Sequence, residues 1–341
     1  MNIFAKAPRQ PQGSLLQWTK SGLRSFAVLA ACASTGFAAR AETFPSRNIR
    51  RVVPFAAGGT VDLFARLVAL EMGKSLGQSV VVENIPGAGG VIGTTNVSRA
   101  APDGYSLCFC ASGSTMLLPL MDSKVSYKIP EDLPPVGHVL RIEQTIIVNT
   151  KKGPNDLAGL VAKARANPGA MFYATPGLGT SNHLAGELLK IAAKIDVRAV
   201  HYRGESAAVL DLLSGQLDYI VASMSFAEPY SRAGELQVLA LPGPSRWPNN
   251  ASIPTIAESG YPGFDATTQI GLHASKGTPR DRIETINAAM NTALQSKDLR
   301  EKFALGGATP QGGSVDDYAK FLQVETAKWD KVIQQAGIKL D

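Results

Sequence analysis

Two glycine-rich loops carry residues that could bind an anion. In the first, residues 53–62 read VPFAAGGTVD, so an apolar strand leads through Gly58 and Gly59 into a helix that starts near Thr60. The first N–H groups of a helix lack partners within it, and its macrodipole favours negative charge there. This spacing predicts an anion-binding loop with Thr60 as N-cap and Asp62 in the first turn. A Gly-Gly pair also makes ordinary turns, and that alternative stays open.

The second loop has the same layout in the other half of the chain. Residues 174–183 read ATPGLGTSNH, and Gly177 and Gly179 precede Thr180 and Ser181 at the start of another helix. Hydroxyl groups beside a helix N-terminus suit a carboxylate oxygen. We expect the two loops to face each other across a cleft.

A third segment, residues 201–206, reads HYRGES and supplies the one permanent cation in these loops, Arg203. A guanidinium group can bind a carboxylate with two parallel hydrogen bonds. It can equally pair with Glu205 at the surface, and the sequence leaves both alternatives open.

Residues for enzyme chemistry are present, but not in the patterns that catalysis requires. Ser112, Ser114 or Ser181 would be the nucleophile, with His183 or His201 as base. None of these serines lies in a Gly-x-Ser-x-Gly elbow or a Ser-x-x-Lys pair. His183 falls within a helix, where a structural hydrogen bond is the commoner role. We therefore predict no catalytic residues and no enzyme.

Cofactor and metal sites are not predicted either. Residues 83–93 are rich in glycine, but they lack the Gly-x-Gly-x-x-Gly spacing and Pro86 interrupts the turn, so an ordinary turn is the favoured interpretation. Cys108 and Cys110 are two apart on an expected strand, where α-carbons lie too far apart for easy bridging, so we predict that they are unpaired. No further Cys or His stands at metal-ligand spacing.

Alternating strand and helix patterns must position these loops. Short runs that are apolar on both faces alternate with helical patterns, which is typical of α/β proteins with parallel sheets covered by helices. We predict an α/β fold with two doubly wound domains. The predicted strands are 49–55, 80–83, 106–111, 146–149, 171–174, 199–201, 217–222, 237–241 and 266–274. Predicted helices include 61–76, 207–213, 280–295, 298–305 and 314–335.

Two extended segments, 136–150 and 263–274, predict crossovers between the domains. If both are hinges, the first domain is discontinuous and comprises residues 44–143 plus 266–341. Residues 144–265 then form the second domain, and the C-terminal helices return to cover the first.

The first 41 residues have the layout of an export signal. They hold five of the 34 basic residues and none of the 28 acidic ones. An Ala-rich apolar stretch leads to Ala39-Arg40-Ala41, which fits a small-x-small cleavage site. We predict that residues 1–41 are removed and that the chain is periplasmic. The competing interpretation is a lipoprotein signal, Leu29-Ala30-Ala31-Cys32, which would anchor the chain through Cys32.

The remaining chain is nearly neutral, which argues against a basic nucleic-acid-binding face. It also lacks an apolar run of the length that a membrane helix requires. We therefore predict that the partner is a small molecule and not a nucleic acid. We also predict that the protein is a monomer.

Several motifs together resemble the Bug, or tripartite tricarboxylate transporter receptor (TctC-like), family of periplasmic solute-binding proteins. The resemblance runs from about Phe44 to Asp341. Its matching segments are Val53–Asp62, Glu83–Gly93, Ala101–Tyr105, Gly177–Glu187, Tyr202–Gly204 and Gly215–Asp218. Six ordered matches are far more specific than any single glycine loop.

The resemblance implies a periplasmic binding protein fold of type II, or Venus flytrap, whose two domains close on a ligand by hinge motion. It implies capture of a small carboxylate-bearing ligand largely by backbone amides and hydroxyl groups, often through ordered water, so that affinity need not depend on a charged side chain. The partner would be a membrane permease of the tripartite tricarboxylate type, or alternatively a membrane sensor. The ligand contacts that it implies are Phe55, Gly58, Gly59, Thr60, Asp62, Gly177, Gly179, Thr180 and Ser181, with Tyr202, Arg203 and Ser223 as weaker candidates. Ser112 lies in a loop that departs from the family pattern, so we expect it to tune specificity.

Overall fold

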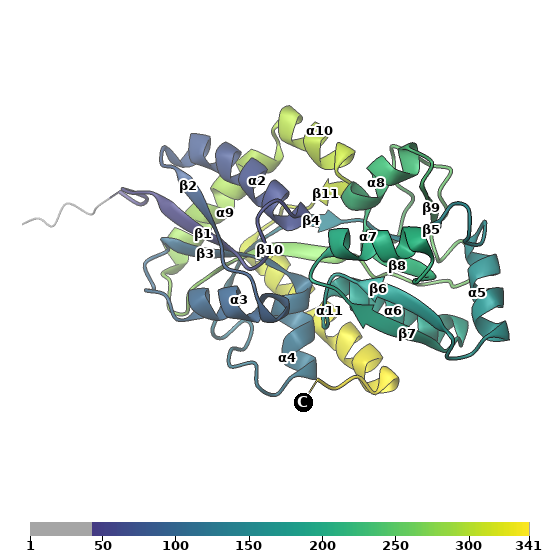
Figure 1. Cartoon of the computed structure of the whole chain (residues 1–341). Coiled ribbons are helices and arrows are strands. Elements are labelled where there is room, and N and C mark those ends of the chain that lie inside the picture. The colour runs from purple at the N-terminus through teal and green to yellow at the C-terminus, as the bar shows by residue number, and fades with distance from the viewer. Residues whose placement is uncertain (1–42, 341) are drawn as a thin grey trace, which may run out of the picture. The chain divides into compact units, whose positions relative to one another are not determined.

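The computed structural model describes residues 43–340, which form two β-sheets with helices around each (Figure 1). The predicted export signal, its cleavage site and Cys32 lie outside the described residues. No helix between residues 43 and 340 combines the length and apolar character needed to cross a membrane.

The first sheet has six strands in the order β11-β4-β10-β3-β1-β2. These are β1 (Ile49–Val53), β2 (Val80–Asn84), β3 (Ser106–Ala111), β4 (Pro135–Ile142), β10 (Thr268–Ala274) and β11 (Ala308–Pro310). Its helices are α2 (Thr60–Leu76), α3 (Val91–Ser98), α4 (Leu118–Met121), α9 (Arg280–Leu294), α10 (Lys297–Leu305) and α11 (Val315–Ala336). Two shorter helices are the 3-10 helix η1 (Ala88–Gly90) and the π-helix η2 (Gly113–Leu117). On α2, Phe64, Val68 and Met72 are fully buried at a spacing of four, which places them on one face of the helix.

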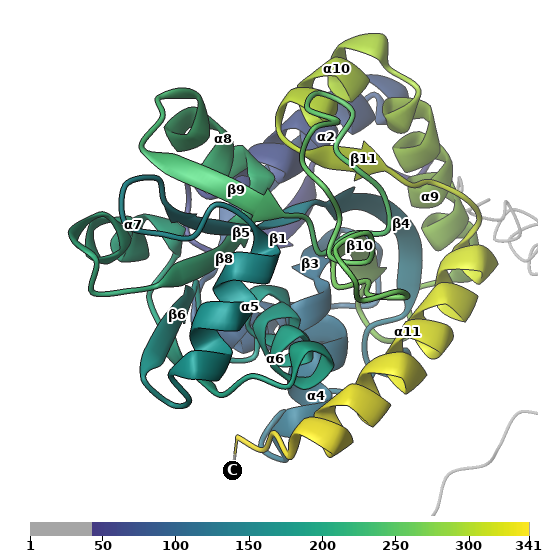
Figure 2. The same cartoon turned by 90° about the vertical axis from the view of Figure 1, so that its right-hand side faces the viewer.

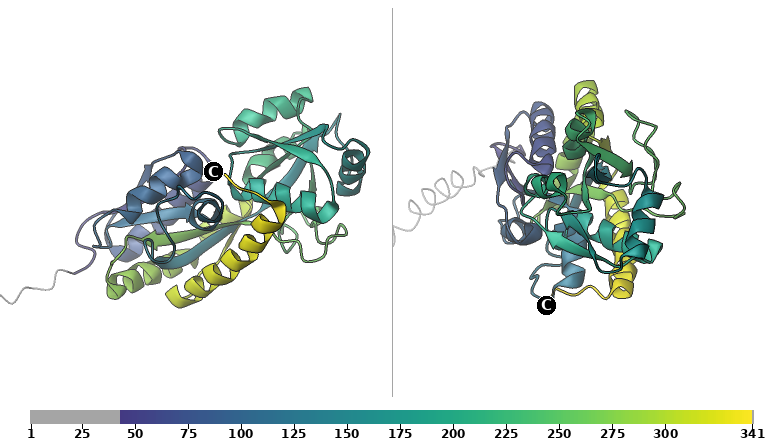
Figure 3. Two further views of the ribbon diagram at one scale, coloured as in Figure 1. Left: turned by 90° about the horizontal axis from the view of Figure 1, so that it is seen from below. Right: turned by 45° about the vertical axis from the view of Figure 1, so that its right-hand side comes forward.

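The second sheet has five strands in the order β7-β6-β8-β5-β9. These are β5 (Gln144–Asn149), β6 (Met171–Thr175), β7 (Val197–His201), β8 (Tyr219–Ser223) and β9 (Leu236–Ala240). The helices between these strands are α5 (Leu157–Ala166), α6 (Ser181–Ala193), α7 (Glu205–Ser214) and α8 (Met224–Arg232). Figure 3 shows the two sheets and their helices as separate groups in the view from below.

Both sheets are mixed, whereas the apolar runs predicted parallel sheets. β1 pairs in parallel with β2 and β3, but β10 runs antiparallel to β3 and β4. In the second sheet, β5 runs antiparallel to β8 and β9. The α/β class and the two-domain architecture are confirmed. Strands buried on both faces look alike in sequence whichever direction they run, so periodicity alone could not reveal the reversed ones.

The chain passes between the sheets twice. Glu143 alone separates β4 from β5, and residues 241–267 lead from β9 back to β10. All strands of the first sheet lie before Glu143 or after Thr267, and β5 to β9 form the second. On this distribution we propose the domain boundaries given above, 44–143 plus 266–341 and 144–265.

The C-terminal helix α11 contacts elements of both domains (Figure 2). It packs on β4 and α9 of the first sheet and also contacts α6 of the second. Beyond the helix, the Leu340 N–H donates to the Met121 carbonyl oxygen at 3.0 Å. The last described residues therefore lie beside α4.

Cys108 and Cys110 form a disulfide, so the prediction that they are unpaired is wrong. Their α-carbons are 5.3 Å apart, within the range that a disulfide spans. Two residues of a regular strand advance about 6.6 Å, so β3 is contracted at Phe109. Both cysteines are buried.

Candidate ligand-binding cleft

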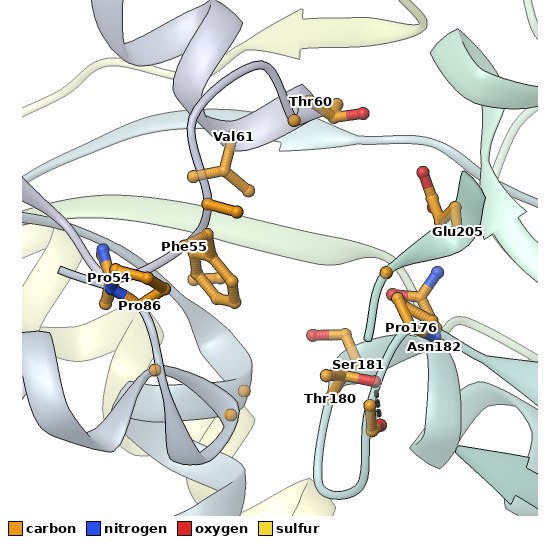
Figure 4. A pocket seen from close by; sticks show the side chains of 18 of the residues that line it. Pro54, Phe55, Thr60, Val61, Pro86, Pro176, Thr180, Ser181, Asn182 and Glu205 are labelled. Atoms are coloured by element: carbon orange, nitrogen blue, oxygen red, sulfur yellow. Dashed lines mark hydrogen bonds between the residues drawn. The ribbon is translucent and has the colours of Figure 1, made fainter. Parts of the chain in front are cut away.

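A cleft of about 540 Å³ opens between the two domains. Figure 4 shows Phe55 and Thr60 on one wall and Ser181, Asn182 and Glu205 on the other. The lining residues from the first domain are Pro54, Phe55, Ala56, Gly59, Thr60, Val61, Pro86, Gly87, Ala88, Gly89, Gly90, Ala111, Gly113, Ile142 and Thr268. Those from the second are Pro176, Gly177, Thr180, Ser181, Asn182, Tyr202, Arg203, Gly204, Glu205 and Ser223.

The N-terminus of α2 opens into this cleft. Gly59 is the N-cap, in an extended conformation, so the prediction that Thr60 caps the helix is wrong by one residue. The Thr60 hydroxyl instead bonds Ser223 Oγ at 3.1 Å and Ser225 Oγ at 3.0 Å in the second domain. No side chain caps α2, and within residues 43–340 the backbone N–H groups of Thr60 and Val61 have no hydrogen-bond partner. These two groups are available to an anion.

Asp62 braces the same loop and does not line the cleft. Its carboxylate accepts from the Gly58 N–H and from Asn84 Nδ2, both at 2.9 Å, and from Arg66 Nε at 3.0 Å. Burial alone would raise the pKa of Asp62, but the hydrogen bonds from Arg66, Gly58 and Asn84 together hold this pKa below its usual value. Gly58 also lies outside the lining and supplies the positive φ of 78° that the turn needs.

The N-terminus of α6 faces the cleft from the other domain. Thr180 is its N-cap, and its hydroxyl accepts from the His183 N–H and donates to the Gly177 carbonyl oxygen at 2.7 Å. Ser181 Oγ bonds Ser112 Oγ at 2.8 Å. In the described chain, the backbone N–H groups of Ser181 and Asn182 have no partner. The free donors of this loop are therefore mainly backbone amides, whereas the sequence predicted the hydroxyl groups of Thr180 and Ser181.

Two more of the residues singled out in the sequence lie behind the α6 loop. Ser112 is buried and accepts from the Gln269 N–H at 3.2 Å, in addition to its bond to Ser181. The Gly179 N–H donates to His183 Nδ1 at 3.3 Å. Burial lowers the pKa of His183 to about 4, with a further contribution from neighbouring His201. His183 is thus a neutral, structural histidine at pH 7.

The Tyr202–Glu205 segment forms the edge of the cleft. Tyr202 donates its hydroxyl to Asp211 Oδ2 at 2.5 Å. The Arg203 side chain is exposed and has no hydrogen-bond or ion-pair partner among residues 43–340, so it does not pair with Glu205. Glu205 instead accepts from the N–H of Ser223 at 2.5 Å and from its hydroxyl at 2.9 Å.

Nine of the thirteen residues predicted as contacts line the cleft. They are Phe55, Gly59, Thr60, Gly177, Thr180, Ser181, Tyr202, Arg203 and Ser223. The other four do not line the cleft: Asp62, Ser112 and Gly179 are buried behind the lining, and Gly58 is exposed in the loop that leads to α2.

Sequence reasoning missed the turn at residues 86–90, which it took for ordinary turn architecture. Gly90 has a φ of 102°, and a β-carbon there would lie 2.9 Å from Ser114 Cβ and 3.4 Å from the Phe55 ring. The glycines therefore let this turn pack closely against Phe55 in the cleft wall. The high number of glycines in this segment was the sequence signal that could have pointed to its place in the cleft wall. Asn182 and Glu205 were also missed, because nothing in their local sequence marks them.

Residues 64–338 match the family model described as tripartite tricarboxylate transporter family receptor. The match spans most of the chain and most of both domains. The chain belongs to this family. Its members are periplasmic receptors for transporters and not enzymes, which confirms the predicted family and the prediction that the chain is not an enzyme. Among residues 43–340 there is also no group of three or more potential metal ligands.

Relatives of this receptor cover nearly its whole length. Protein BugT of Bordetella pertussis is 38% identical over 312 residues, which make up 90% of this chain and 95% of BugT. The structure of Rhodopseudomonas palustris Rpa4515 with adipate is 32% identical with a TM-score of 0.81, covering 87% of this chain and 99% of that one. MatC from Rhodopseudomonas palustris with bound malate is 31% identical with a TM-score of 0.78, covering 85% and 100%.

Proposed function

We propose that this receptor captures a small carboxylate-bearing molecule in the cleft between its domains. The observation that carries the proposal is the pair of helix N-termini, α2 and α6, that reach the cleft from opposite sides with free N–H groups. Two such termini can hold one carboxylate group between them, or the two ends of a dicarboxylate. The relatives with adipate and malate support the same ligand class.

The contacts between the domains suggest how binding is coupled to closure. Thr60 bonds Ser223 and Ser225, and Ser112 bonds Ser181, so two sets of hydroxyl groups join the domains beside the cleft. A ligand that touches both helix termini has more contacts in this closed arrangement than in an open one. Its differential affinity would shift the hinge equilibrium toward closure.

We further propose that the closed receptor delivers its ligand to a membrane permease of the tripartite tricarboxylate type. The chain would reach the periplasm after cleavage behind Ala41, or as a lipoprotein through Cys32. Intact-mass spectrometry of the exported protein distinguishes the two routes, since only the second leaves Cys32 as an acylated first residue.

Proline substitution at the first residue of α6 tests the role of the backbone amides. The N-cap Thr180 is extended, so Ser181→Pro fits the helix start and removes the N–H, whereas Ser181→Ala removes only the hydroxyl. A charge-assisted hydrogen bond contributes about 1.5–3 kcal/mol, so Ser181→Pro should bind adipate or malate about 10-fold or more weakly than Ser181→Ala. Isothermal titration calorimetry measures both affinities.

Lys297→Pro is the matched control, because Lys297 is the exposed first residue of α10, outside the cleft lining. It should leave affinity unchanged. Equal affinities for Ser181→Pro and Ser181→Ala would contradict ligand binding by the N-terminus of α6. If a neutral diamide bound as tightly as the diacid, the proposal that the cleft recognises a carboxylate would be wrong.

A further inference from the structure

The cleft also contains hydrogen-bond acceptors, which a carboxylate cannot satisfy. Asn182 lines the cleft from the first turn of α6 and is 9% exposed. Its Nδ2 donates to the Val221 carbonyl oxygen at 3.1 Å, and this bond fixes the amide so that Oδ1 is the end left for the cleft (Figure 4). Oδ1 has no partner in the described chain. A carbonyl oxygen accepts hydrogen bonds and cannot donate them.

Glu205 adds a second acceptor on the same wall. Each of its carboxylate oxygens accepts one hydrogen bond from Ser223 and has room for another. No Lys, Arg or His within residues 43–340 forms an ion pair with it. Burial raises the pKa of Glu205, although the two bonds from Ser223 oppose that shift. A partly buried carboxylate without a cation favours a ligand that brings a donor or a positive charge.

These two acceptors restrict the acids that fit. A purely aliphatic dicarboxylate would leave Asn182 Oδ1 unpaired and would bring its own negative charge close to Glu205. We infer that the ligand carries, beside its carboxylate, an N–H or O–H donor that Asn182 and Glu205 accept. This inference rests on the proposed function, and it makes these two residues determinants of specificity.

The test uses acids that differ only at carbon 2. Succinate, malate and aspartate carry hydrogen, hydroxyl and ammonium there, and the 2-hydroxy and 2-amino derivatives of glutarate and adipate extend the series to longer chains. Calorimetry on the exported chain measures each dissociation constant. An acceptor left unpaired typically costs a factor of about ten or more in affinity, so within any chain length that binds, the donor-bearing acids should exceed the bare acid by about that factor.

Two variants assign the preference to its residues. Glu205→Gln keeps the size of the side chain but removes its charge, so it should reduce the advantage of the ammonium acid much more than that of the hydroxy acid. Asn182→Leu removes the amide and should reduce both advantages. Glu228→Gln, on α8 and outside the cleft lining, is the matched control and should change neither. Thermal melts of each variant verify folding, and Glu205→Gln alone suffices if Asn182→Leu does not fold.

The outcomes separate the two proposals. If no acid of any chain length binds, the proposed function fails. If acids bind but the bare members bind as tightly as the donor-bearing ones, the proposed function stands and this inference is wrong. A donor preference that survives both variants would also overturn the assignment to Asn182 and Glu205. A preference for hydroxyl over ammonium identifies a hydroxy acid, and the reverse identifies an amino acid.

Discussion

Asp62 shows how one buried side chain can hold a loop beside the cleft without lining the cleft itself. It lies in the first turn of α2, where negative charge is favoured by the macrodipole, and it also accepts from Gly58, Arg66 and Asn84. These bonds fix the turn that leads to the free N–H groups of α2. A carboxylate at this position therefore stabilises the loop and leaves the helix terminus open for a different anion.

Replacement of Asp62 by Asn tests this role. The amide group cannot accept all of these bonds, so Asp62→Asn should lower the free energy of unfolding by about 1–3 kcal/mol. Urea unfolding measures the change. Asp316→Asn is the control, because Asp316 also lies in the first turn of a helix but is 79% exposed. Asp316→Asn should lower the free energy of unfolding by no more than about 0.5 kcal/mol. An equal decrease in both variants would mean that Asp62 stabilises the protein only through its position in the first turn of a helix.

At the scale of elements, one of the contacts between α11 and the first sheet places a tyrosine directly above a glycine. The Tyr318 hydroxyl bonds buried His273 Nε2 at 3.1 Å, and its ring stacks on His138. A β-carbon on Gly271 would lie 1.8 Å from the Tyr318 hydroxyl oxygen. Gly271 has no positive φ, so the need for glycine here comes from the lack of space for a β-carbon and not from the backbone conformation.

Gly271→Ala should consequently destabilise the protein by about 1–3 kcal/mol or more. The reason is displacement of Tyr318, so the effect should be largely absent in a Tyr318→Ala background. A double-mutant cycle by urea unfolding measures this coupling. Additive losses would mean that Gly271 acts through something other than Tyr318.

Elements with strong apolar patterns were predicted well from the sequence. Residues 106–111 were predicted as a strand with the observed ends, and 280–295 as a helix that differs from α9 by one residue. β11 was missed, because its three residues pair only with one edge of β4. α8 was missed because Pro229 lies inside it, and proline normally argues against a helix.

The candidate site was predictable where glycine and hydroxyl residues cluster along the chain. The loops at α2 and α6 were found in this way. Asn182 and Glu205 could not be found, because their position in the cleft depends on the placement of β8, whose Val221 and Ser223 hold them. That is a long-range property, which no local motif records.

At the scale of the whole molecule, three buried histidines link stability to pH. Burial lowers the pKa of His138, His183 and His273 to about 4 each, against 6.5 for a free histidine. Between pH 6.5 and 4 the unfolded state therefore binds more protons than the folded state. The stability that these groups confer is complete above pH 6.5 and is lost as the pH falls toward 4.

Histidine replacements can isolate this effect. Gln at position 138 can keep the bond that His138 Nε2 makes to Gln269, and Asn at position 183 can keep the acceptor that serves the Gly179 N–H. Between pH 7 and pH 5, His138→Gln/His183→Asn should lose about 2 kcal/mol less stability per replaced histidine than the wild type. Urea unfolding at both pH values measures this difference.

Comparison with the wild type is essential, because Glu143 and Glu205 have pKa values raised by burial and act in the opposite direction. Parallel pH profiles for variant and wild type would mean that these histidines do not titrate on unfolding.

The disulfide between Cys108 and Cys110 has a practical consequence for testing the proposed closure in solution. It occupies both thiols of the described chain, and both sulfurs are buried in β3. Cysteines introduced at Leu70 on α2 and Leu210 on α7, which are 63% and 70% exposed, would then be the reactive sites for maleimide dyes. Because these helices belong to different domains, energy transfer between the two fluorophores would test the proposed closure on single molecules.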